Sequence, residues 1–424
     1  MWLLRLAISD LQFIFAEELQ NIEVEMNTKK IFLLLAIIGF VGTAYAQIIP
    51  TAKFGKGVNF MAKDSSMSLK IHFRMQQLLM AEYDGGTEEW STNFLVRRSR
   101  LKFGGFAFSP KLQYKAEIGL SNRDISTSSE DGNGSGASRL ILDAVLKYQF
   151  QKHWQVWIGQ TKLPGNRERV ISSANLHFVD RSLLNSKFNI DRDMGVQLHG
   201  KYTLGENFII QPKFALTQGE GRDITSGNHG GLNYTGRVDL LPLGKFEGKK
   251  EDYMAADIVR QSKPKLALGF TYNFNQGAVR QQGQLGKFVY DSTGSAYSEN
   301  DLTALQADLH FKYKGFSIMS EWANTSSAED IVGTSRKYNT GSAFSIEAGY
   351  VLKGSNIEPA LRYTTINPDD DTFSGITQTN MLTFGLSKYI VGHNLKIQSD
   401  FSYLTYQGVA EADLLYRFQV EMQF

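Results

Sequence analysis

Apolar and polar side chains alternate with a period of two over most of the chain after Gln47. In the first clear run, one face carries Met67, Leu69, Ile71, Phe73 and Met75. The intervening positions include Lys70 and Arg74. Because successive side chains of a β-strand point to opposite faces, this pattern predicts strands with one apolar and one polar face.

The same alternation predicts about sixteen strands, with a margin of two. The further runs are 94–108, 112–120, 140–150, 154–161, 196–202, 208–216, 232–240, 266–274, 303–313, 316–322, 344–350, 357–363, 382–386, 395–403 and 414–424. After Gln47 we find no apolar run of the roughly 20 residues that a transmembrane helix requires. The absence of cysteine excludes disulfides and thiol chemistry.

Long and short connections take turns between these runs. The long ones are 82–92, 122–138, 162–191 and 219–231, and the short ones are 109–110, 151–153, 204–207, 314–315, 353–356 and 391–393. Soluble β-sandwiches also alternate, but this asymmetry is typical of outer-membrane barrels, which have long outer loops and tight periplasmic turns. We therefore predict an all-β, transmembrane, antiparallel β-barrel, closed because hydrocarbon tolerates no unpaired sheet edge.

One connection departs from this scheme. Residues 242–263 lie on the side of the short turns yet span about twenty residues. Two interpretations stay open, a periplasmic insertion or a slip of the strand assignment.

The N-terminus has the pattern of a secretory leader. Lys29 and Lys30 precede an apolar run at 31–41, and Ala44 and Ala46 form an A-x-A site before Gln47. We predict a signal peptide at 26–46, a mis-called extension at 1–25 and the barrel at 47–424. A membrane anchor is the alternative, but the run is short for one.

The last run ends on an aromatic residue, Phe424. It follows five alternating apolar positions and is similar to the terminal signal that the barrel-assembly machinery reads. The alternative is an ordinary edge strand.

Basic residues gather on one face of the early strands. Arg98, Arg100 and Lys102 are spaced by two, and by the same parity Lys70, Arg74 and Lys115 face the same side. We predict that they form a basic track in an aqueous lumen, since rings of Arg and Lys select anions in pores. Arg97 has the opposite parity, so the run could instead be merely basic.

The long connection 162–191 is also rich in basic residues. It contains Lys162, Arg167, Arg169, Arg181 and Lys187. Folded inward, it would narrow the channel and offer guanidinium forks to phosphate. The alternative is a solvated surface loop that contacts lipopolysaccharide phosphates.

Several segments together resemble the phosphate-selective porin O and P family. They are Arg97-Arg98-Ser99-Arg100-Leu101-Lys102-Phe103-Gly104-Gly105, Ile158-Gly159-Gln160-Thr161-Lys162-Leu163-Pro164-Gly165, Glu168 to Ser173, Asp180-Arg181-Ser182 and Arg192-Asp193-Met194-Gly195-Val196-Gln197. The resemblance covers 47–424. It implies a sixteen-stranded, trimeric diffusion channel whose third outer loop enters the lumen, with Arg98, Arg100 and Arg181 in the basic track. The chain departs from the family at Pro164-Gly165-Asn166, where Phe-Gly is common.

The leading hypothesis is therefore an anion-preferring channel for phosphate or polyphosphate, with inorganic anions, lipopolysaccharide and the assembly machinery as partners and no cofactor or nucleic acid. The alternatives are a general or organic-solute porin and, remotely, an outer-membrane hydrolase, for which we find no G-x-S-x-G or H-E-x-x-H motif. The Asp369-Asp370-Asp371 run and the Gly-rich segment 132–137 are typical of solvated, flexible loops.

Overall fold

The computed structural model describes residues 51–125, 140–224, 229–291, 293–328, 337–369 and 378–424. The predicted leader with Ala44, Ala46 and Gln47, the Gly-rich segment 132–137, Asp370 and Asp371 lie outside the described residues. Among the described residues, no helix is long and apolar enough to cross a membrane.

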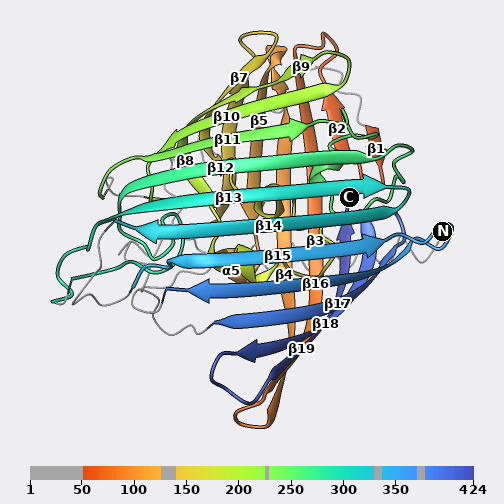
Figure 1. Cartoon of the computed structure of the whole chain (residues 1–424). Coiled ribbons are helices and arrows are strands. Elements are labelled where there is room, and N and C mark those ends of the chain that lie inside the picture. Colours follow the sequence, from red (N-terminus) through yellow and green to blue (C-terminus); the bar gives the residue numbers. More distant parts are fainter. Residues whose placement is uncertain (1–50, 126–139, 225–228, 292, 329–336, 370–377) are drawn as a thin grey trace, which may run out of the picture. The chain divides into compact units, whose positions relative to one another are not determined.

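Sixteen antiparallel strands close into a barrel (Figure 1). They are β3 (Met67–Asp84), β4 (Glu89–Ala107), β5 (Ser109–Gly119), β6 (Ile141–Tyr148), β7 (Trp154–Lys162), β8 (Arg192–Gly200), β10 (Phe208–Thr217), β11 (Asn233–Leu241), β12 (Lys265–Ala278), β13 (Asn300–Tyr313), β14 (Phe316–Ser327), β15 (Gly341–Tyr350), β16 (Ile357–Pro368), β17 (Thr379–Tyr389), β18 (Leu395–Tyr406) and β19 (Asp413–Gln423). Each pairs with the next, and β19 pairs with β3 to close the ring. The predicted fold class is confirmed.

The C-terminal residue takes part in this closure. The Phe424 backbone exchanges two hydrogen bonds with Phe73 on β3, of 2.8 and 2.9 Å. The two rings lie 5.7 Å apart. Phe424 is thus paired on the sheet and is not a free edge, although recognition by the assembly machinery stays a prediction.

Three short strands were not predicted. β9 (Tyr202–Leu204) continues the pairing of β8 along β10. β2 (Gly57–Met61) pairs with the start of β3, below the level at which β19 ends, and β1 (Thr51–Lys53) pairs with β2. The N-terminal segment therefore extends the wall at the end of the barrel where the short turns lie.

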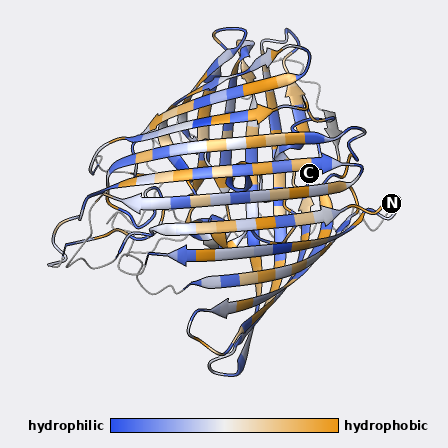
Figure 2. Ribbon diagram, viewed as in Figure 1, coloured by the Kyte–Doolittle hydropathy of each residue, from blue (hydrophilic) through white to orange (hydrophobic). Residues whose placement is uncertain are grey.

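The two faces of the wall differ as the alternation predicts. Figure 2 shows polar and apolar residues alternating along the strands. Large apolar side chains are exposed on the outside, among them Phe94, Phe214 and Phe384, where a barrel meets lipid. Polar side chains of the opposite parity, such as Gln76 and Asp239, are buried inside.

The connection between β3 and β4 is shorter than predicted, and the segment between β11 and β12 resolves an alternative that the sequence left open. The first outer connection is 85–88, not 82–92, because β3 and β4 stay paired as far as Asp84 and Glu89 after the alternation of polarity has faded. The long segment between β11 and β12 does not displace the strands. It contains a 3-10 turn, η2 (Glu251–Tyr253), and is an insertion.

This insertion enters the barrel. Lys312 on β13 donates to the Glu251 and Ala256 carbonyl oxygens, each at 2.9 Å. Ala255 N donates to the Asn175 carbonyl at 2.8 Å, which joins the insertion to the connection between β7 and β8.

Candidate functional site

The connection 163–191 crosses the interior of the barrel. It leaves β7, forms the short helices α4 (Arg167–Val170) and α5 (Leu183–Lys187), and returns to β8. On the way it bonds to strands all round the ring: its Val179 N donates to Asp400 on β18 at 2.9 Å, and Ser173 accepts from Arg74 on β3 at 3.0 Å. A segment between β7 and β8 reaches β3 and β18 only through the lumen. The predicted inward path is therefore what the structure has.

Arg167 anchors one side of this loop. Its Nη2 donates to Asp239 on β11 and its Nε to Asp308 on β13, both at 2.8 Å, and its Nη1 donates to the Asp252 carbonyl of the insertion at 3.1 Å. The Arg167 side chain is only 1% exposed. Two carboxylates balance its charge, so Arg167 holds the loop in place and offers little charge to passing ions.

Asp180 anchors the opposite side. It accepts from Arg97 at 2.8 and 3.1 Å and from Arg98 at 2.9 Å, and Arg417 of β19 lies 3.8 Å away. Burial raises the pKa of the Asp180 carboxyl, but Arg98, Arg97 and Arg417 outweigh burial and hold it well below its usual range.

The prediction that Arg97 faces away from Arg98 is wrong. The register of β3 and β4 slips at this point, so that Gln76 faces Arg98 while Gln77 faces Val96. Arg97 is the extra residue of a β-bulge, which turns its side chain to the same side as its neighbour.

The predicted ladder does share one face. Arg74 is opposite Arg100, and Lys102 is opposite Glu117. Most of its charges are paired, however: Arg100 with Asp124 at 2.9 Å, Lys115 with Asp143 at 2.7 Å, and Lys102 more loosely with Glu117 at 3.5 Å. These carboxylates come from neighbouring strands and the next loop, so parity alone could not reveal them.

Two further predicted residues are also paired. Arg74 donates to Glu421 on β19 at 2.7 Å, and the Arg74 side chain is 1% exposed. Arg169 binds Asp191, with Nε at 2.7 Å from Oδ1. Both pairs fix parts of the wall or loop.

Lys162 and Arg181 differ because their bonds go to neutral carbonyls. Lys162 Nζ donates to the carbonyls of residues 169 to 171, the shortest bond being 2.6 Å. Arg181 donates to the carbonyls of Glu168 and Ile171, at 2.9 and 2.7 Å. Burial, together with Arg169 and Arg98, lowers the pKa of Arg181 well below its usual value. A positive potential without a matching carboxylate attracts anions.

A group of lysines lies nearer the periplasmic end. Lys70 on β3 is within electrostatic range of Lys56 and Lys249, and Lys147 on β6 is within range of Lys115 and Lys250. For Lys70 and Lys147 the described residues supply no carboxylate or carbonyl partner within bonding distance. Lys147 Nζ lies 3.4 Å above the Trp157 ring, whose plane stacks on His199 at 4.0 Å.

The sequence did not predict Lys147 as part of the basic track, because it is the lone lysine of its strand and has no basic neighbour two positions away. Lys187, predicted from the same loop as Arg181, ends α5 and borders a small cavity with Asn189 and Asn275. Burial lowers the pKa of Lys187.

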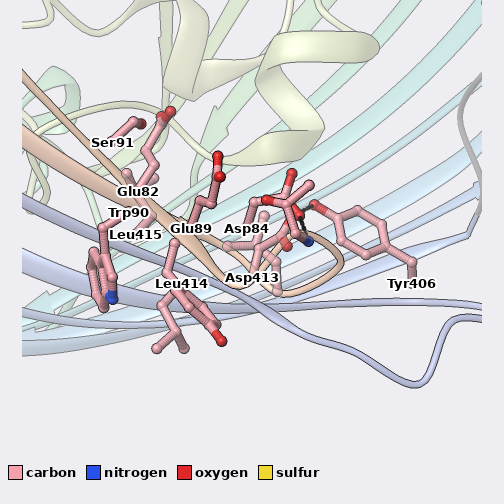
Figure 3. Close-up of a pocket in the computed structure, with 12 residues that line it drawn as sticks. Glu82, Asp84, Glu89, Trp90, Ser91, Tyr406, Asp413, Leu414 and Leu415 are labelled. Atoms are coloured by element: carbon pink, nitrogen blue, oxygen red, sulfur yellow. Dashed lines mark hydrogen bonds between the residues drawn. The ribbon is translucent and has the colours of Figure 1, made fainter.

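The outer end of the barrel is acidic. A cavity of about 560 Å³ lies between the ends of β3, β4, β18 and β19, and its lining includes Glu82, Asp84, Glu89 and Asp413 (Figure 3). Asp413 accepts from the Tyr406 hydroxyl at 2.6 Å. Exposed carboxylates among the described residues of this end are Glu82, Asp84, Glu88, Glu89, Glu299, Asp369 and Glu411. In the same described part, the exposed lysine is Lys287.

A closed sixteen-stranded barrel with a lipid-facing belt, a polar interior and an inward-folded loop defines a porin-type channel of the bacterial outer membrane. The phosphate-selective porin O and P family model matches residues 69–424. The chain therefore belongs to this family, as its sequence motifs indicated.

Solved structures share the fold at low identity. An anion-selective porin from Comamonas acidovorans is 11% identical with a TM-score of 0.52, covering 84% of this chain and all of that one. The outer-membrane channel DcaP of Acinetobacter baumannii is 10% identical with a TM-score of 0.52, covering 86% of this chain and 99% of that one. The trimer form of OmpT of Vibrio cholerae is 11% identical with a TM-score of 0.51, covering 85% of this chain and all of that one. A search of curated proteins gave no match.

Proposed function

We propose that the protein is a passive diffusion channel that prefers anions, and that phosphate or polyphosphate is its solute. The observation that carries this proposal is a set of lumen cations for which the described residues supply no carboxylate within ion-pair distance, Lys70, Lys147, Lys162 and Arg181. They lie at two levels, the loop that narrows the lumen and the region below it. An anion leaving one level meets a second positive level before it reaches the periplasm.

Arg181 favours phosphate over a simple halide. Its Nε and Nη2 are held by the Glu168 and Ile171 carbonyls, which fix the guanidinium plane. A fixed guanidinium offers parallel N–H donors to one oxyanion, whereas a lysine acts as a point charge. The family name and the anion-selective porin among the similar structures support the same solute class.

The remaining partners follow from the same reasoning. The trimeric form of a similar channel supports a homotrimer. The acidic outer end supports contact with lipopolysaccharide through bridging divalent cations. The paired Phe424 supports recognition by the assembly machinery, and we infer a channel and not a hydrolase, since the fold and family are those of channels.

Reversal potentials in planar bilayers test the proposal. A KCl gradient should give an anion-selective potential, and added phosphate should block chloride current at low concentration. The double variant K70Q/K147Q should weaken both effects, while K353Q on a periplasmic turn should leave them unchanged. Cation selectivity, or chloride current indifferent to phosphate, would contradict the proposal.

A less selective porin is the second candidate, and the acidic cavity of Figure 3 favours it. Carboxylates at the outer end of the barrel repel anions and would favour neutral or cationic solutes. Liposome swelling would then rank sugars by size alone and would not respond to K70Q/K147Q.

A further inference from the structure

Exposed lysines gather at the short connections of the periplasmic end, within them or a few residues away. Around the barrel these include Lys111, Lys152, Lys201, Lys314, Lys353 and Lys388. Exposed carboxylates are scarce at the same end of the described structure, where they are Asp64, Glu206 and Glu247. The outer end has the reverse balance, so the two ends of the barrel differ in the sign of their exposed charge.

These six residues, here called the lysine rim, lie at the periplasmic ends of the strands, and some of them adjoin the lipid-facing wall. Phe150 precedes Lys152 and is 44% exposed, and Ile390, 48% exposed, follows Lys388. Lys314 Nζ lies 5.0 Å from the ring of Tyr313, and Arg260 is 5.7 Å from the ring of Tyr350. A cationic head beside exposed apolar and aromatic groups is the arrangement of a side chain whose stem lies against acyl chains and whose charge reaches the headgroups.

The distribution of the rim identifies its partner. A soluble protein would require one continuous patch, whereas these lysines are spread over connections from β4–β5 to β17–β18. A surface that surrounds the whole barrel is the membrane leaflet itself. At the periplasmic end that leaflet consists of phospholipids, whose anionic headgroups complement the charge.

We propose that the lysine rim binds anionic phospholipid headgroups of the inner leaflet of the outer membrane and so sets the depth and orientation of the barrel there. The inference is independent of the solute, because Lys152, Lys314 and Lys353 of the rim lie in turns, beyond the ends of the strands that wall the lumen. The lumen lysines Lys70, Lys147 and Lys250 provide a matched control of equal charge in another place.

The test compares lipid retention by the full chain in nanodiscs of phosphatidylethanolamine with one quarter phosphatidylglycerol. Phospholipid that stays bound through detergent exchange is counted by mass spectrometry. The wild type should retain phosphatidylglycerol in excess of its share. The rim variant K152Q/K314Q/K353Q should bind it roughly tenfold more weakly or worse, whereas K70Q/K147Q/K250Q should retain it.

Two further measurements make the result decisive. The charge-preserving K152R/K314R/K353R should bind as the wild type does, which separates charge from misfolding. The rim variant should also keep the wild-type reversal potential, so a failure here is distinct from a failure of the proposed channel function. Unselective retention by the wild type, or equal loss in both glutamine variants, would overturn the proposal. The proposal would also be overturned if the rim variant kept phosphatidylglycerol but no longer co-sedimented with purified peptidoglycan, because the rim would then bind the cell wall.

Discussion

The arginines at the level of the inward loop and the lysines below it are both basic and both face the lumen, yet they are used differently. Arg74, Arg98 and Arg167 each bind carboxylates at 2.7 to 2.9 Å. Lys70 and Lys147 have no such partner among the described residues. A basic residue in a pore is thus not by itself part of an ion path. Paired cations hold the loop, and the proposed function assigns the lumen potential to the cations that have no ion-pair partner.

The largest effect should come from Arg167. Replacing it with Met removes the charged hydrogen bonds that Arg167 gives Asp239 and Asp308. These carboxylates keep Arg237 and, at Asp239, Lys213 as partners. Because the two buried carboxylates each lose a charged hydrogen bond and the loop loses its anchor, we expect about 3 kcal/mol less stability and a loop detached from β11 and β13. Guanidinium unfolding and single-channel conductance would report the loss and a wider pore. As a control, K353M on a periplasmic turn should change neither, and an unchanged R167M would refute the anchoring role.

The lysine pair should have the next largest effect, on selectivity and not on stability. In K70Q/K147Q the chloride-to-potassium permeability ratio should fall several-fold, since two cations without an ion-pair partner leave the lumen. Its unfolding midpoint should stay near that of the wild type because no ion pair is broken. A stable variant with unaltered selectivity would contradict the claim that cations without an ion-pair partner determine the anion preference.

Asp180 offers a smaller and opposite effect. D180N removes the shared partner of Arg97 and Arg98, so their charge becomes available and anion preference should rise by a factor of about two. R98A should lower the preference by less than K70Q/K147Q does, because Arg98 is already neutralised. Reversal potentials measured side by side in low salt check the order, and a fall in D180N would contradict it.

The smallest effect concerns an unpaired acid at the outer end. Glu220 accepts from His229 N at 2.8 Å, while its second oxygen is buried with no hydrogen-bond partner. Burial raises the pKa of Glu220 from 4.5 to about 7. The folded state therefore holds the proton more tightly than the unfolded one, and the packing of the loop should weaken as the pH rises from about 4.5 to 7.

Limited proteolysis between β10 and β11 at pH 5 and pH 8 checks this prediction. Cleavage should be faster at pH 8 in the wild type, and E220Q should abolish the difference. The neighbouring D223N is the matched control. Equal cleavage of the wild type at both pH values would show that protonation of Glu220 does not control the packing of this loop.

The strands could be predicted from the sequence because their pattern is local. Period-two alternation and the spacing of the turns suffice to place all sixteen, and a polar lumen follows from parity. The inward loop could be suspected only from its length and charge. β2 was missed because five residues hold too short a pattern, and its pairing depends on where β19 ends.

The sequence predicted which residues form the basic track but not which of them are paired with carboxylates. Arg98, Arg100 and Lys102 do share a face, yet their partners Asp180, Asp124 and Glu117 lie 15 to 82 residues away in the chain. The bulge at Arg97 is a property of two paired strands, so one strand's parity could not reveal it.

By itself the sequence determined that this chain forms an outer-membrane barrel with a basic early wall, because side-chain alternation and turn length act between neighbours in the chain. Only the tertiary structure decided which of those bases remain available to an ion. Whether a cation is neutralised depends on carboxylates within a few ångströms. Barrel closure and the path of the inward loop bring those carboxylates from distant parts of the chain.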